Sequence, residues 1–284
     1  MMRSDSPAMY LHSSMPTNLP ARMRQVAAPL YWIGLALLLL SISTLALTLL
    51  DGRQLQGVSV WLKPFKFQLS TGVYLLTLAL CMVWLPPAAL HTKTARYVVW
   101  AAVVAGLFEV GYITWQGSQG QASHFNTATP FLATMYTLMG VGAVVLASAS
   151  LALGVLISRS AYDLQPALKL AVVLGLVLTF LIGTGFGGYL SAQHAGHWVG
   201  GALSDSGGLP LFKWSRSGGD LRVAHFFGIH AMHFIPAFAL VLDWTRVPQK
   251  TAVRAVWVFA LIFTAFCIWT FAQARNGMPF LAGV

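Results

Sequence analysis

Long apolar runs that carry almost no charge are the feature that most constrains this chain. Only 8% of its 284 residues are charged and 57% are hydrophobic, whereas a soluble domain has about 25% charged residues. A helix that crosses a bilayer needs about 20 apolar residues, and several runs reach that length. The sequence therefore predicts that lipid and neighbouring helices surround most of the chain.

The apolar runs predict an all-α polytopic membrane protein with seven transmembrane helices and no strands. We expect the helices at about 27–50, 57–85 (with an interfacial lead-in over 57–67), 95–115, 130–157, 167–190, 221–244 and 251–274. Residues 1–24 are polar and lack the pattern of a signal peptide, which predicts a disordered cytoplasmic tail. Residues 25–284 would then form one transmembrane domain with a long periplasmic loop at 191–219.

Basic residues indicate the orientation of these helices. Ten of the 17 Lys and Arg residues fall in segments on the same side as the N-terminus, and seven fall on the other side. Positive residues favour the cytoplasmic side, so we predict a cytoplasmic N-terminus and a periplasmic C-terminus. Because the basic residues lie in short loops rather than on one face, the net charge of +10 does not indicate nucleic-acid binding.

The stretch 218–236 is unlike the other apolar runs because it carries several ionisable groups. Asp220 would cap the helix, and three histidines follow within it. At about 100° per residue, these imidazoles lie within roughly one side of the helix. Ionisable groups at membrane depth are costly and indicate function. Pro236, further along, predicts a kink.

Glu109 is the only glutamate in the chain. It lies six residues before Trp115, so it is about 9 Å below the end of its helix. A carboxylate at that depth must be protonated, paired or bound to a metal. We therefore keep two interpretations open, an ion pair with Lys66 and a role in metal binding or proton transfer.

The histidines and the glutamate together predict a pocket for a transition metal or haem b. Imidazole suits iron, copper and zinc, and a carboxylate adds a hard ligand. The spacing matches no established ligand motif. The predicted metal ligands are His225, His230, Glu109 and, least securely, His233.

Further polar residues gather at the same predicted side of the membrane. Long loops such as the one before the stretch 218–236 are often lids, and lysines near a helix end also snorkel to headgroups. We predict catalytic roles for Glu109, His124 and Lys66, and cofactor-binding roles for Lys63, Arg222, Trp214, His194 and His197. Arg222 also has Asp205 and Asp220 as alternative partners.

Three segments resemble a known family. These are Lys63-Pro64-Phe65-Lys66-Phe67, Ser123-His124-Phe125-Asn126, and the run from Gly219 to Phe226 with Gly228 and His230. Together they resemble an uncharacterised family of bacterial polytopic membrane proteins. The resemblance implies an integral protein of the bacterial inner membrane and brings no established activity with it.

Three functions remain as predictions, and whether the chain is an enzyme stays open among them. The first is a metal- or haem-dependent redox protein with a periplasm-facing His/Glu pocket, whose candidate ligands include a quinone or a small anion. The second is a transporter that couples transport to the protonation of Glu109. The third is a noncatalytic assembly or sensing protein. All three have the lipid bilayer as partner, and none involves nucleic acid.

Overall fold

The computed structural model of this chain describes residues 18–160, 164–193 and 196–281, which are mostly helical. Six helices are long and apolar enough to cross a membrane: α2 (Ala28–Leu50), α3 (Leu62–Met82), α5 (Lys93–Ser118), α6 (Pro130–Arg159), α7 (Pro166–Ser191) and α10 (Gln249–Arg275). The pair α8 (Arg222–Ile229) and α9 (Ala231–Trp244) passes the same test together. The chain is therefore an all-α polytopic membrane protein with six or seven candidate spans.

The predicted continuous helix over 221–244 is wrong, because α8 and α9 meet at an angle of 52°. The break falls at His230, whose backbone is not helical, whereas Pro236 lies inside α9 and does not end it. The Thr179 hydroxyl of α7 donates to the carbonyl of Ile229 (3.4 Å) and accepts from the amide of Met232 (2.9 Å). A side chain inserted in this way replaces the helical hydrogen bonds that the break removes.

The prediction of no strands is also wrong, although the strands are short. They are β1 (Gln54–Leu55), β2 (Val58–Ser59), β3 (Trp198–Val199) and β4 (Gly219–Asp220). β1 and β2 form an antiparallel hairpin around Gln56 and Gly57, which both have positive φ as a two-residue turn requires. β3 and β4 pair antiparallel across the long connection.

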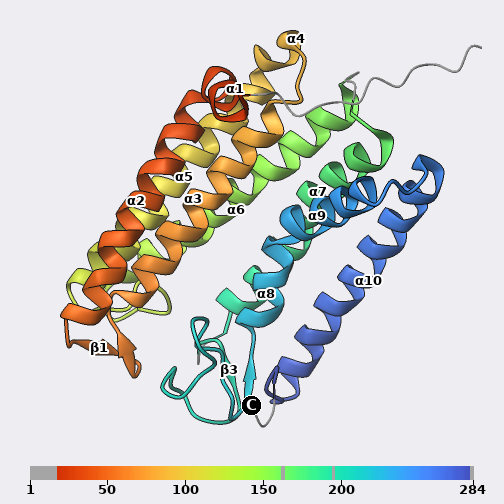
Figure 1. The fold of residues 1–284 in the computed structure, drawn as a ribbon. Helices are drawn as coiled ribbons and strands as arrows, with labels where there is room; N and C mark the ends of the chain where they lie inside the picture. The colour runs from red at the N-terminus through yellow and green to blue at the C-terminus, as the bar shows by residue number, and fades with distance from the viewer. Residues whose placement is uncertain (1–17, 161–163, 194–195, 282–284) are drawn as a thin grey trace, which may run out of the picture.

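Two short helices, α1 (Leu19–Val26) and α4 (Pro87–Leu90), complete the fold. The first begins inside the segment 1–24 that was predicted to be a tail, and residues 1–17 lie outside the described residues. Both short helices lie at one end of the bundle, and the strands lie at the other (Figure 1). We call the latter the β end; it holds the connections 51–61 and 119–129 and, of the longest connection, residues 192–193 and 196–221.

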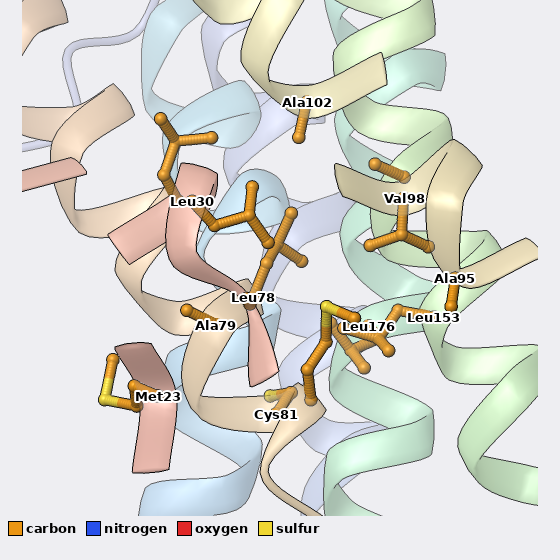
Figure 2. Packing of buried hydrophobic residues seen from close by; sticks show 14 of the residues in the cluster. Met23, Leu30, Leu78, Ala79, Cys81, Ala95, Val98, Ala102, Leu153 and Leu176 are labelled. Atoms are coloured by element: carbon orange, nitrogen blue, oxygen red, sulfur yellow. The ribbon is translucent and has the colours of Figure 1, made fainter. Parts of the chain in front are cut away.

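The long helices pack mostly against their neighbours in sequence. α2 packs on α3, α5 on α6, α6 on α7, and α7 on both α8 and α9. Figure 1 shows α2, α3, α5 and α6 as one group, with α7 to α10 beside it. The main apolar core lies toward the end away from the strands, where α1, α2, α3, α5, α6 and α7 contribute side chains such as Met23, Leu30, Leu78, Val98, Leu153 and Leu176 (Figure 2).

Two glycines allow α2 and α3 to approach closely. A Cβ at Gly72 would lie 2.9 Å from the carbonyl oxygen of Gly34 and 2.8 Å from Cδ2 of Leu38. A Cβ at Gly34 would lie 3.1 Å from the carbonyl oxygen of Gly72. Small residues at such a contact are typical of membrane helices, whose association depends on close packing.

We expect Gly72→Val to destabilise the folded protein by about 2 kcal/mol, because extra methyl groups in a packed interface force the backbones apart. Gly111→Val is the matched control, because a Cβ there meets nothing within 4 Å. The measurement is thermal unfolding in detergent, followed with a thiol-reactive dye that reports exposure of the buried Cys81 and Cys267. Equal midpoints for the two variants would contradict the role assigned to Gly72.

Candidate functional site

The Glu109 carboxyl group is buried inside the bundle. The residue is 4% exposed, and Oε1 has no hydrogen-bond partner among the described residues. A Cβ at Gly142 of α6 would lie 2.8 Å from this oxygen. The absence of a side chain at Gly142 thus leaves the space that the carboxyl group occupies. Because an unpaired carboxylate is costly in such surroundings, Glu109 is suited to hold a proton or to bind a ligand.

The predicted ion pair between Glu109 and Lys66 does not form. Lys66 instead donates from Nζ to the carbonyl oxygen of Phe212, at 3.0 Å. Lys63 forms no ion pair with a carboxylate among the described residues either. Its Nζ lies 5.8 Å from the centre of the Phe67 ring, in the range of a cation–π contact.

His124 lies beside these groups in the connection between α5 and α6. Its ring centre is 6.0 Å from that of Phe67 and 6.0 Å from that of Tyr136. Burial, together with the nearby charge of Lys63, lowers the pKa of His124 well below its usual value. The imidazole is therefore neutral at pH 7, with Nδ1 bonded to the hydroxyl of Ser123 at 3.1 Å.

His225 is fixed against α7 through one ring nitrogen. Nδ1 lies 3.0 Å from the carbonyl oxygen of Gly183, and because a carbonyl only accepts, Nδ1 carries the hydrogen. A Cβ at Gly187 would lie 2.9 Å from Cε1 of the ring. The glycines Gly183 and Gly187 thus allow α7 to pack closely on α8. The neutral ring keeps a lone pair on Nε2, which has no hydrogen-bond partner among the described residues.

His230 and His233 form a chain that ends on α3. The hydroxyl of Thr77 donates to the carbonyl of Val73 (2.8 Å), so its oxygen accepts from Nε2 of His233 (3.0 Å). In the neutral ring of His233, Nδ1 is then an acceptor, and it receives the hydrogen of Nδ1 of His230 at 3.1 Å. This sequence of bonds leaves a lone pair on Nε2 of His230.

The four predicted metal ligands do not form one compact centre. Within the part of the chain that the structure describes, no three His, Cys, Asp or Glu side chains are placed together to hold a metal ion. Haem iron takes one or two axial protein ligands, and a ring held by a carbonyl at one nitrogen is typical of metal-binding histidines. His225 fits that pattern, and its metal or haem binding stays a prediction.

Arg222 joins the long connection to the start of α8. Its guanidinium contacts Oδ1 of Asp205 and Oδ2 of Asp220, each at 2.7 Å, and donates to the carbonyl of Lys213 at 2.7 Å. The prediction left open whether Arg222 pairs with Asp205 or with Asp220, and the structure shows a contact with each. Asp220 also accepts from the amides of Arg222 and Ser215, but the predicted N-cap at Asp220 is wrong by one residue, because the N-cap of α8 is Leu221, which makes no side-chain cap bond.

His197 extends this cluster, with Nε2 3.2 Å from Oδ1 of Asp205. Burial lowers the pKa of His197. Although burial opposes the ionised form of Asp205, the His197 hydrogen bond and the Arg222 charge lower its pKa to about 2. Both groups therefore belong to a structural network of the connection, and a cofactor-binding role for His197 stays a prediction.

Trp214 lies over the start of α8 and closes the β end. Its ring stacks on Phe212 with centres 4.6 Å apart and meets Phe226 edge-on at 5.4 Å. His194, the remaining predicted residue, lies outside the described residues.

Two glutamines of the bundle were not predicted as site residues. Gln68 is fully buried; its Nε2 donates to Thr114 and its Oε1 has no partner among the described residues. Gln116 donates to the hydroxyl of Tyr112 at 2.8 Å. An amide inside an apolar helix is a usable signal, because it needs partners there.

No protein-family model, curated protein or solved structure matches this chain.

The network around Asp205 predicts that acid destabilises the protein. A group whose pKa is lower in the folded state contributes stability above its unfolded pKa and loses it as the pH falls. For His197 the loss begins below about pH 6.5, and for Asp205 it runs from about pH 4 downward. We therefore expect the thermal unfolding midpoint to decrease as the pH is lowered from 7 to 5. The measurement is tryptophan fluorescence of the protein in detergent during heating.

Replacing the imidazole of His197 measures how much this residue contributes to the pH dependence of stability. We expect His197→Gln to reduce the slope of unfolding free energy by up to about 1.4 kcal/mol per pH unit, the value for one proton. His91→Gln, an exposed site at the other end of the bundle, is the control. A slope in His197→Gln that equals the wild-type slope would remove His197 from this role.

Proposed function

We propose that this chain is a seven-span protein of the bacterial inner membrane, with its N-terminus in the cytoplasm and its β end in the periplasm. The bias of basic residues supports this orientation. The bent pair α8 and α9 counts as the sixth span, because together it has the length and composition of one. The polar groups described above would then lie in the periplasmic half of the bundle.

We propose a redox function for this half, with a metal or haem group held by His225 and His230. One observation carries the proposal: the hydrogen bonds of both rings leave their Nε2 lone pairs without a partner among the described residues. Metal-binding imidazoles are neutral, and in the neutral form the hydrogen of each ring lies on Nδ1, away from the lone pair. The group would supply one-electron chemistry, for which iron or copper suits imidazole ligands.

Glu109 is the proton acceptor in this proposal. Its carboxyl group is buried and its Oε1 has no partner in the described part of the chain, so a proton can reside there at low cost. His124 has a neutral ring near Phe67, whose ring Lys63 also contacts, which suits it to pass a proton between Glu109 and the β end. Lys66 would hold the connection in place over the site.

The test is an absorption spectrum with elemental analysis on protein purified in detergent. We expect a Soret band or about one equivalent of transition metal per chain, and a loss of at least tenfold in its occupancy in His225→Ala. His91→Ala, which changes an exposed histidine at the opposite end of the bundle, should keep full occupancy. Wild-type protein with neither metal nor haem, even after supplementation during growth, would overturn the redox proposal.

A proton-coupled transporter is the second candidate. The buried Glu109 and the chain from His230 through His233 to Thr77 favour it, since both are typical of proton relays in membranes. One observation argues against a transporter. Beyond the hydrogen bonds of His230 and His233, toward the end away from the strands, the bundle is filled by the apolar core around Leu78 and Met82.

Proteoliposomes with an imposed proton gradient distinguish this candidate. A transporter should take up substrate from a mixed pool of labelled metabolites, and Glu109→Gln should reduce proton-driven uptake at least tenfold, because an amide cannot bind the coupling proton. Uptake by Glu109→Gln equal to wild-type uptake would exclude Glu109 as the coupling group. The exposed Asp243 of α9 provides the control, and Asp243→Asn should transport as wild type does.

A further inference from the structure

Two lysines in the first turns of α3 have no acidic partner. Lys63 and Lys66 are both half-buried. Among the described residues neither is within 4.0 Å of a carboxylate. Lys66 bonds only to the carbonyl of Phe212, and Lys63 makes only a cation–π contact. The two lysines are three residues apart, so they share one face of α3 and their positive charges add.

The nearby carboxylates compensate for these charges only in part. Asp205 and Asp220 are both bound to the single Arg222, so the three groups together leave one negative charge near two lysines. Glu109 forms no ion pair with either lysine within the described residues, and its Oε1 is unpartnered. The amino end of a helix adds a further partial positive charge to its first turn, which normally favours acidic residues there. A partly buried pair of cations in such a field is costly unless an anion is present.

The surroundings of the lysines are apolar and aromatic as well as positive. Phe67 lies under the ammonium group of Lys63, and Phe212 stacks on Trp214 where the connection meets Lys66. In this same loop Leu211 and Lys213 both have positive φ, at 64° and 58°. Residues other than glycine rarely adopt a backbone conformation with positive φ. Backbone strain of this kind is typical of segments that hold a ligand.

We propose that Lys63 and Lys66 bind an amphipathic oxyanion, a carboxylate or phosphate attached to an apolar chain or ring, beneath the loop 209–214. The oxyanion takes the N–H donors of the two ammonium groups. The apolar part lies against the aromatic rings that border them. The site is distinct from the lone pairs of His225 and His230, and it does not depend on a redox cofactor.

The experiment measures thermal unfolding of the full chain in a neutral detergent, with the thiol-reactive dye described above. The probes are decyl phosphate, decanoate and the uncharged decanol, all at equal ionic strength. We expect the two anions to raise the wild-type midpoint by about 3 °C or more at a large excess over Kd. Decanol should raise it by less than about 1 °C, because it offers no charge to the lysines.

Lys63→Gln/Lys66→Gln should lose this anion-dependent shift. The variant relieves the repulsion between two like charges but loses the bond from Lys66 to the carbonyl of Phe212. Its midpoint without ligand should therefore stay close to that of wild type, and that midpoint shows that loss of folding does not account for the result. Lys93→Gln/Lys250→Gln, at the opposite end of the bundle, should keep the shift. The proposal is overturned if neither anion stabilises the wild type, or if the shift survives in Lys63→Gln/Lys66→Gln.

Two further arms identify the source of the anion. Inorganic phosphate tests a free oxyanion, and micelles doped with phosphatidylglycerol or phosphatidylcholine test a lipid headgroup. Stabilisation by phosphatidylglycerol that depends on Lys63 and Lys66, but is absent with inorganic phosphate, assigns the site to an anionic lipid. Stabilisation by inorganic phosphate that depends on the same lysines assigns it to a soluble anion.

Discussion

The hydroxyl group of Thr179 makes the histidine arrangement possible. A helix interior to a membrane satisfies its own backbone groups, and a break at that depth is tolerated only when another group replaces the lost bonds. Thr179 does so at the junction of α8 and α9, bonding both the carbonyl of Ile229 and the amide of Met232. With the backbone satisfied, the chain turns by 52°.

The turn at His230 lies between His225 on α8 and His233 on α9. His225, before the turn, bonds to the backbone of α7. His233, after it, reaches Thr77 on α3 and so connects the two groups of helices. On one straight helix the three rings would share roughly one side, as their spacing predicts. The break therefore explains why no three-donor centre forms among the described residues, while single rings keep an unpartnered nitrogen.

The sequence was sufficient for the membrane class and for most of the span positions. Apolar length decides a spanning helix, and the predicted range 130–157 lies within α6 (Pro130–Arg159). The sequence did not predict the break between α8 and α9. Pro236 predicted a kink at the wrong position, and the hydroxyl group that stabilises the break, on Thr179 of α7, lies 50 residues before Ile229. Nor did the sequence separate Lys63 from Lys66, since both share one helix face and only the long connection determines that Lys66 bonds to Phe212.

Two glycines contribute to the candidate site because they lack a side chain and so leave space for their neighbours. Gly142 provides the space for the Glu109 carboxyl group, and Gly187 allows the ring of His225 to lie against α7. Neither glycine has a positive φ, so backbone freedom does not explain them. In a water-soluble protein, a buried carboxyl group or imidazole would usually be placed by polar neighbours. Here the lipid-facing helices offer few such groups, and the positions of both side chains depend on where a methyl group is absent.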